Sequence, residues 1–173
     1  MHLEIHNKLA ELALFNLALD SKLRACDLLK LKVRDIMLGG TIQSRVTIRQ
    51  QKTQSPVQFE LTVKTRDSMS CWIESGNLNL QDFLFPSNRG KNNRISYHSY
   101  SRLVKRWVSM IGLDATRYGT HSMRRTKASL IYNRTKNLRA IQLRLGHSKL
   151  ESTVRYLGVE IEDALSISEN TDI

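Results

Sequence analysis

The last third of the chain holds residues whose types and spacing suit the cutting of a phosphodiester. His121 and Arg124 lie three residues apart, and Tyr156 comes nine residues after His147. On a helix, side chains three residues apart project from the same side, so one phosphate can contact both His121 and Arg124. The set predicts a site in which a tyrosine hydroxyl is the nucleophile and fixed positive charge is the catalyst.

Further cations lie upstream of this segment. Arg24 precedes a predicted helix, and Lys52 sits among polar residues in a predicted β-hairpin. An arginine donates two hydrogen bonds at once from a planar fork and keeps its charge, so Arg24 and Arg124 would clamp the phosphate. A lysine at a hairpin tip can reach a duplex while it stays charged, which suits Lys52 to protonate the departing 5′ oxygen.

The predicted nucleophile depends on these cations, because a tyrosine phenol is mostly protonated at neutral pH. Its reference pKa is about 10, so only about one phenol in a thousand is ionised at pH 7, a gap of roughly 4 kcal/mol. Arginines and a histidine around the phosphate would help to close that gap by stabilising the developing charge.

Each residue also has a plainer structural explanation. His121 could cap a helix that begins between Thr120 and Ser122, and His147 could cap the helix before it. Lys52 fits an ordinary exposed turn, Tyr156 the edge of a core, and Arg24 a surface charge. The hypothesis of a phosphodiester-cutting site therefore rests on the combination, because no single spacing is distinctive.

Composition favours an anionic partner. The 173 residues fit one domain with a short tail, and 27 Lys+Arg against 16 Asp+Glu give a net charge of +11, as expected of a protein that binds nucleic acid or an anionic lipid surface. The basic residues are spread from Lys22 to Arg155, unlike those of a disordered arm. A basic protein without such a partner is the alternative.

The cysteines and the apolar segments exclude other classes. Cys26 and Cys71 are far apart and predict neither a zinc site nor a disulfide framework, so reduced cytosolic thiols are expected. The most apolar early stretch, Leu12–Leu19, is broken by Asn16, and no signal peptide or membrane span is predicted.

Hydrophobic periodicity predicts an α+β fold that is mostly helical, with a small three-stranded antiparallel sheet. The predicted helices are Leu3–Leu19, Ala25–Leu31, Lys64–Ser75, Tyr97–Ile111, Ser122–Tyr132, Leu138–Leu145 and Thr153–Leu157. The predicted strands are Val33–Leu38, Thr41–Gln50 and Val57–Val63, and the segment Gly76–Asn93 is predicted as a loop. The residues predicted to face the core are Phe83, Leu84 and Phe85 of that loop and Tyr100, Leu103, Val104, Trp107, Val108 and Ile111.

Five ordered segments resemble the catalytic domain of tyrosine recombinases, the phage integrase family. They are Leu23-Arg24-Ala25-Cys26-Asp27-Leu28-Leu29, Gln51-Lys52-Thr53, Thr120-His121-Ser122-Met123-Arg124-Arg125-Thr126, Leu145-Gly146-His147-Ser148 and Thr153-Val154-Arg155-Tyr156. The resemblance covers most of the chain and implies the tyrosine recombinase catalytic-domain fold. It also implies an active site made of Arg24, Lys52, His121, Arg124, His147 and Tyr156, with Asp27 as a supporting residue.

The resemblance further implies a mechanism. Tyr156 would attack a DNA phosphate, form a 3′-phosphotyrosyl link and release a 5′-hydroxyl, which then attacks the partner duplex. Such a reaction requires no metal or nucleotide cofactor, and the sequence has no acidic metal cluster or P-loop. The expected partner is double-stranded DNA. The chain would bind it as a homotetramer and would be a monomer without DNA, and accessory DNA-bending proteins are compatible partners. The expected location is the cytoplasm, on the nucleoid.

The chain also departs from the family pattern. Ser21-Lys22-Leu23 stands where the family often has a Thr-Gly pair before the first arginine, so the turn there is expected to differ in shape.

The catalytic domain is expected to span residues 1–159, followed by a tail, residues 160–173, that would contact a neighbouring subunit. The usual N-terminal core-binding domain is not recognised. Two alternatives remain, a DNA-binding regulator that does not cut and a relaxing enzyme similar to type IB topoisomerases.

Overall fold

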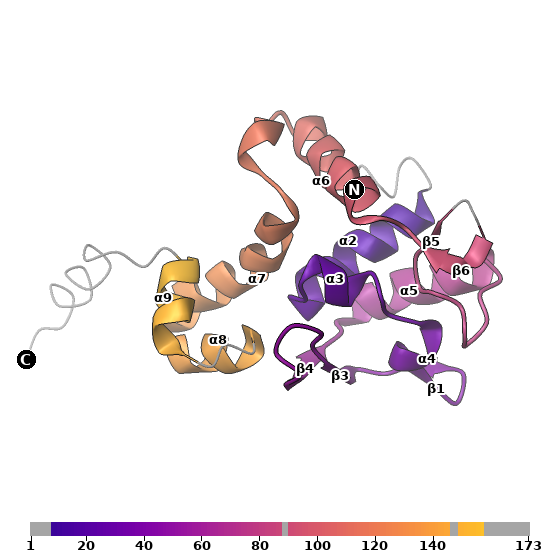
Figure 1. Ribbon diagram of the computed structural model, residues 1–173, viewed down its shortest axis with the longest axis horizontal. Coiled ribbons are helices and arrows are strands. Elements are labelled where there is room, and N and C mark those ends of the chain that lie inside the picture. Colours follow the sequence, from indigo (N-terminus) through magenta and orange to yellow (C-terminus); the bar gives the residue numbers. More distant parts are fainter. Residues whose placement is uncertain (1–7, 88–89, 146–148, 158–173) are drawn as a thin grey trace, which may run out of the picture.

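The computed structural model describes residues 8–87, 90–145 and 149–157, and helices dominate it (Figure 1). The longer helices are α2 (Leu9–Ser21), α5 (Val63–Ser75), α6 (Tyr97–Met110) and α7 (Thr120–Thr135). The shorter ones are α3 (Ala25–Leu28), α4 (Val33–Ile36), α8 (Leu138–Leu145), α9 (Leu150–Leu157) and a 3₁₀ turn, Ala115–Arg117. The predicted helices from residue 8 onward are thus confirmed, with shifted ends. The start of the predicted Leu3–Leu19 helix lies outside the described residues.

Helix α2 lies at the centre of the main core. It packs against both α5 and α7, and its Leu17 has no exposed surface. Phe59, Met69 and Tyr100 come from a strand and from the two helices α5 and α6 and are also buried in this core. Burial of large apolar side chains from segments distant in the sequence supplies most of the favourable free energy of folding.

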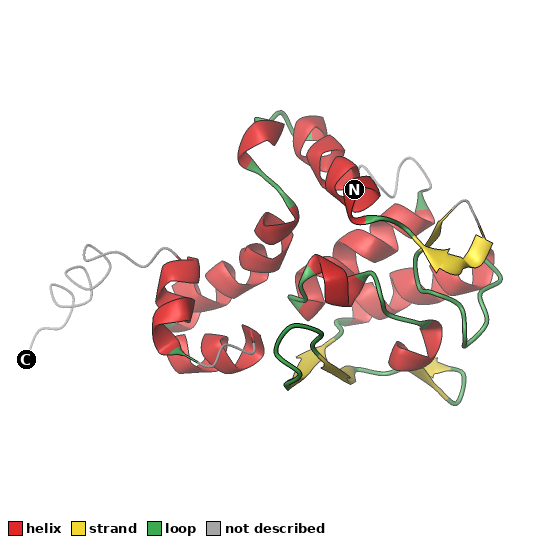
Figure 2. Cartoon of the chain, viewed as in Figure 1, coloured by secondary structure: helices red, strands yellow, loops and turns green. Residues whose placement is uncertain are grey.

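The strands form separate hairpins (Figure 2). Each of the three ladders has two antiparallel strands: β1 (Met37–Leu38) with β2 (Thr41–Ile42), β3 (Arg45–Arg49) with β4 (Pro56–Glu60), and β5 (Pro86–Ser87) with β6 (Gly90–Arg94). The predicted class, α+β with mostly helices and a small amount of antiparallel sheet, is confirmed. Within the described residues the strands do not join into the single three-stranded sheet that the pattern predicted.

The segment Val33–Leu38 was predicted as a strand, and this prediction is wrong for most of its length. Val33–Ile36 forms the single turn α4, in which Val33 and Ile36 are both buried. The Asp35 carboxylate accepts a hydrogen bond of 2.8 Å from the backbone N–H of Lys32 and so caps this turn. A three-residue spacing of apolar residues suits a helical turn, and here the local cap outweighs the strand propensity of the β-branched side chains.

The region predicted as the loop Gly76–Asn93 contains the strands β5 and most of β6. Leu84 and Phe85 are buried as predicted, and Phe83 is half-buried. On α6, Tyr100, Val104 and Trp107 are buried, with Leu103 and Val108 partly buried against the core. Ile111 is 63% exposed, so its predicted inward position is wrong. It caps the C-terminus of α6, where the chain turns away at Gly112 with a φ of 76°.

Helices α7, α8 and α9 stand to one side of the main body in Figure 1. They have a second, smaller core of Ala128, Tyr132, Ile141 and Leu145. Of the helices in the described ranges, none is both long and apolar enough to cross a membrane.

The Asp20 carboxylate, at the C-terminal end of α2, connects three helices. Its Oδ1 accepts a hydrogen bond from Lys127 Nζ of α7, and its Oδ2 accepts bonds of 2.8 Å from the Thr62 N–H and 2.6 Å from the Thr65 hydroxyl at the start of α5. Burial raises the pKa of Asp20, but Lys127, Thr65 and Thr62 together outweigh burial, and the net pKa lies below its ordinary value. This network fixes α7 to the main core.

We predict an acid-dependent loss of stability through this carboxylate. Because the pKa of Asp20 is lowered in the folded state, its contribution is fully present above the ordinary value of 3.8 and is lost as the pH falls through the lower folded value. In Lys127→Met the folded pKa rises, so the free energy of unfolding should be about 2 kcal/mol lower at pH 7 and should decline less on acidification. Urea unfolding between pH 7 and pH 2 measures both effects. Lys105→Met, at an exposed position of α6, is the control, and equal pH slopes in the two variants would contradict the role of Asp20.

Candidate functional site

Arg24 occupies the N-cap position of α3, and its side chain is bonded to the β3–β4 hairpin. Its Nη1 donates a hydrogen bond of 2.6 Å to Oε1 of Gln50, the residue after β3. The Thr53 hydroxyl donates to the same oxygen at 3.0 Å. The predicted helix start beside Arg24 is confirmed, and the first predicted cation therefore lies beside the turn that carries Lys52.

Asp27 makes a second connection between α3 and this turn. Its side chain is buried, and Oδ1 accepts a hydrogen bond of 2.8 Å from the Gln51 backbone N–H. Its Oδ2 is also buried and has no hydrogen-bond partner among the described residues. The contact to Gln51 holds the backbone next to Lys52, and the supporting role of Asp27 stays a prediction.

Lys52 lies at the exposed tip of the hairpin. The turn is closed by the Gln50 N–H, which donates to the Ser55 carbonyl at 3.0 Å, and by the Gln54 N–H, which donates to the Gln50 carbonyl at 2.9 Å. Gln54 has a φ of 54°, in the left-handed region. The ammonium of Lys52 thus extends into solvent from a turn whose base is fixed to Arg24 and Asp27.

Arg124 is almost completely buried, with 4% of its surface exposed, on the first turns of α7. Its Nε donates a hydrogen bond of 2.7 Å to the Lys22 carbonyl, and its Nη2 donates one of 2.8 Å to the Leu145 carbonyl at the end of α8. These bonds fix the plane of the guanidinium. Because Lys22 is only two residues before Arg24, they also bring the two predicted phosphate-binding arginines into one region.

Lys22 has an unusual conformation for a residue with a side chain. Its φ is 55°, and only 2% of its surface is exposed. Its ammonium donates a hydrogen bond of 2.8 Å to the Asp20 carbonyl. The sequence departs from the family pattern here by having a lysine where a glycine is common, and the chain still adopts the left-handed turn that suits glycine.

Two of the remaining predicted residues, His121 and Tyr156, belong to helices α7 and α9. His121 is exposed in the first turn of α7, which begins at Thr120 as the predicted helix start requires. His147 lies outside the described residues. Tyr156 belongs to α9, which packs against α7 and α8, but its side chain also lies outside the described part of the structure. The described contacts therefore bring together Arg24, the Lys52 turn and Arg124.

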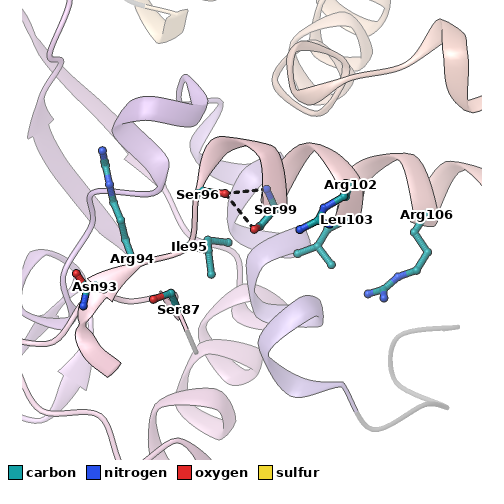
Figure 3. A pocket seen from close by; sticks show the side chains of 9 residues that line it. All are labelled: Ser87, Asn93, Arg94, Ile95, Ser96, Ser99, Arg102, Leu103 and Arg106. Carbon is teal, nitrogen blue, oxygen red and sulfur yellow. Dashed lines mark hydrogen bonds between the residues drawn. The ribbon is translucent and has the colours of Figure 1, made fainter. Parts of the chain in front are cut away.

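A further feature of the main body is a basic groove (Figure 3). It has a volume of about 770 Å³ and lies between the β5–β6 hairpin and α6, with Arg94, Arg102 and Arg106 among its lining residues. Arg94 also lines a smaller hollow with Cys26 of α3, the helix that begins after Arg24. This groove was not predicted from the sequence, although the four-residue spacing of Arg102 and Arg106 on a predicted helix indicates a basic face.

Arg106 also stabilises the wall of the groove through its ion pair with Glu11 of α2. Burial raises the pKa of the Glu11 carboxyl, but Arg106 and a hydrogen bond from the Trp107 indole outweigh burial and leave the pKa below its ordinary value. Among the residues that the structure describes, no three His, Cys, Asp or Glu side chains gather in a cluster able to hold a metal ion.

The chain belongs to the phage integrase family, whose model matches residues 2–162. It is 25% identical to tyrosine recombinase XerD of Yersinia pestis over 93% of this chain and 54% of that protein. It is 24% identical to the probable integrase/recombinase YoeC of Bacillus subtilis (strain 168) over 85% of this chain and 76% of that protein. The chain thus spans about half the length of the XerD relative.

Solved structures show the same fold. XerA recombinase matches with a TM-score of 0.78 and 17% identity, over 97% of this chain and 59% of that one. The catalytic domain of bacteriophage HP1 integrase matches with a TM-score of 0.54 and 20% identity, over 96% of this chain and 92% of that domain. The fold is therefore that of a tyrosine recombinase catalytic domain, as the sequence predicted.

The conformation of Lys22 leads to a prediction about stability. An L-residue in the left-handed region costs about 1 kcal/mol relative to glycine, so Lys22→Gly should have a free energy of unfolding about 1 kcal/mol higher than Lys22→Ala. Both variants lose the lysine side chain, and their difference isolates the backbone. Chemical denaturation of the pair measures it. At Lys105, inside α6, the same comparison should have the opposite sign, and the same sign at both positions would contradict the left-handed turn.

Proposed function

We propose that this chain is the catalytic domain of a site-specific DNA recombinase or integrase, which cleaves and rejoins DNA through a 3′-phosphotyrosyl intermediate. The observation that carries the proposal is the fixed pair of arginines. Arg124 is held by the Lys22 and Leu145 carbonyls, and Arg24 is held by Gln50. Lys22 and Arg24 both belong to the short segment between α2 and α3. Fixed guanidinium groups lose little conformational freedom when they bind a phosphate, which favours stabilisation of the transition state.

In the proposed reaction the Tyr156 phenol gives its proton to solvent, and the resulting phenolate oxygen attacks the scissile phosphorus. The bond from phosphorus to the 5′ oxygen breaks, and Lys52 gives that oxygen a proton, so a 5′-hydroxyl leaves. Arg24, Arg124, His121 and His147 stabilise the charge on the non-bridging oxygens. A 5′-hydroxyl of a second duplex then reverses these steps, and the energy of the broken bond is kept in the tyrosyl link.

The basic groove between the β5–β6 hairpin and α6 supports double-stranded DNA as the substrate. Arg94 and Arg102 are exposed along it, and the net charge of the chain is +11. Backbone phosphates of a duplex engaged at Arg24 would continue into this groove past the shared lining residue Arg94. The solved relative XerH, matched with a TM-score of 0.72 and 22% identity over 94% of this chain and 48% of that one, is bound to its difH substrate.

The assembly is part of the proposal. The chain would act as a homotetramer on two duplexes, with residues 160–173 in contact with a neighbouring subunit and accessory DNA-bending proteins as further partners. These residues lie outside the described part of the structure. Such an enzyme would act in the cytoplasm, on the nucleoid. Both the extent of the catalytic domain, residues 1–159, and this assembly remain predictions from the sequence.

The decisive experiment is a suicide-substrate assay. Nicked duplexes that trap the cleaved strand are incubated with the chain and with Tyr156→Phe, and protein–DNA adducts are separated on a denaturing gel. An adduct formed by the wild-type chain alone supports the proposal. Binding without an adduct favours the non-cutting regulator, and relaxation of plasmids without a special site, by wild type but not Tyr156→Phe, favours the topoisomerase-like activity.

We predict that Arg124→Lys slows cleavage about 100-fold. A lysine carries the charge but cannot donate from a fixed fork to a phosphate and to the Lys22 and Leu145 carbonyls. Single-turnover adduct formation measures the rate, and the melting temperature shows whether the fold is kept. Arg125→Lys, one residue along α7 and exposed, is the matched control and should cleave at the wild-type rate. Near-wild-type cleavage by a folded Arg124→Lys would remove Arg124 from the proposed role.

A second prediction concerns the groove. Each phosphate contact lowers the slope of log K against log salt concentration by about 0.9, so Arg94→Ala/Arg102→Ala should flatten that slope by about 1.8 units. Binding of a fluorescent duplex to the Tyr156→Phe protein at several salt concentrations measures the slope. A double alanine variant of Arg34 and Lys105, which are exposed and do not line the groove, is the comparison of equal charge. An unchanged slope in the groove variant would exclude DNA from this groove.

A further inference from the structure

Gln50 is a buried polar residue outside the predicted set of catalytic residues. Only 1% of its surface is exposed, at the end of β3 where the hairpin turn begins. Its side-chain oxygen accepts hydrogen bonds from Arg24 Nη1 at 2.6 Å and from the Thr53 hydroxyl at 3.0 Å. A buried amide is costly unless its hydrogen-bonding atoms are satisfied, and this one contacts a predicted phosphate-binding arginine.

The turn itself is held closed by other contacts. The backbone N–H and carbonyl of Gln50 bond to Ser55 and Gln54, and the Gln51 N–H bonds to Asp27. These contacts depend on the backbone at position 50 and not on its side chain. Loss of the Gln50 amide therefore leaves the closure of the hairpin in place and removes the acceptor that directs Arg24.

Direction matters for an arginine because its donors lie in one plane. A guanidinium that makes one bond to a fixed acceptor presents its other N–H groups in set directions, whereas a guanidinium without that bond samples several rotamers. A neutral acceptor is also the suitable one here. A carboxylate at position 50 would hold Arg24 equally well but would neutralise part of the charge that a phosphate needs.

We propose that Gln50 is a positioning residue for catalysis, which holds the Arg24 guanidinium toward the scissile phosphate through its side-chain oxygen. The inference rests on the proposed function and extends it to a residue that does not touch the substrate. Thr53, which donates to the same oxygen, fixes the orientation of the Gln50 amide.

The test uses Gln50→Met, an unbranched side chain of similar size that lacks the acceptor. Its rate of adduct formation on a nicked suicide duplex should fall about tenfold to hundredfold, because small misplacements of a catalytic group carry such costs. Its melting temperature and its affinity for DNA should stay near the wild-type values. Gln58→Met, at an exposed position of β4 in the same hairpin, is the matched control and should cleave normally.

A second substrate separates positioning of Arg24 from general damage to the site. In a duplex with a methylphosphonate at the scissile position, a methyl group replaces one non-bridging oxygen, so the linkage carries no charge for Arg24 to neutralise. Gln50→Met should then cleave this neutral substrate within about threefold of the wild-type rate. An equal loss on both substrates, or no loss on the normal one, overturns the inference.

The two proposals fail in different ways. If the wild-type chain forms no Tyr156-dependent adduct on either substrate, the proposed function is wrong and the inference is overturned with it. If the wild-type chain forms the adduct and Gln50→Met matches it on the phosphodiester, the proposed function stands and only the role of Gln50 is overturned.

Discussion

The site depends on the buried guanidinium of Arg124. A charged group that is 96% removed from solvent is stable only when strong hydrogen bonds replace its hydration, and here two backbone carbonyls do so. One carbonyl belongs to the turn between α2 and α3, and the other to the end of α8. The contact that solvates Arg124 therefore also joins the main core to the smaller α7–α8 core. Removing it would leave a buried charge unsatisfied and separate the elements that carry the predicted active site.

A second layer of contacts surrounds this centre and depends on it. Lys22 offers its carbonyl to Arg124 because the chain is in a left-handed turn, and the Lys22 ammonium bonds back to Asp20. Asp20 in turn holds Lys127, one turn farther along α7 than Arg124. Two residues of the α2 end thus orient one face of α7. Helix α3 is in turn bonded to the β3–β4 hairpin through Arg24 and Asp27. These bonds bring Lys52, 28 residues after Arg24 in the sequence, into the same region.

Much of this arrangement could be predicted from the sequence, since periodic apolar residues located α5, α6 and α7 and the ordered motifs identified the family. The limits had physical causes. Val33 and Ile36 are β-branched, and only the local cap from Asp35 makes that segment a helical turn. The strands pair as separate hairpins because each hairpin closes on its own, and the strand propensity of single residues does not indicate which strands will pair. The roles of Lys22 and Gln50 depend on a backbone dihedral and a tertiary contact, so no residue pattern could reveal them. The site residues remain predictions, and the contacts of Arg24 and Arg124 give them a structural basis.

The division of the apolar core has a consequence for local dynamics. The main core draws on α2, α5, α6, the hairpins and Met123 of α7, whereas the second buried cluster consists of Ala128, Tyr132, Ile141 and Leu145. Local opening costs less free energy where fewer apolar contacts are broken, so amide protons of α8 and α9 should exchange with solvent through subglobal openings, while those of α2 exchange only on global unfolding. We therefore expect the helix that carries Tyr156 to belong to the less stable cooperative unit, which opens while the main core stays folded.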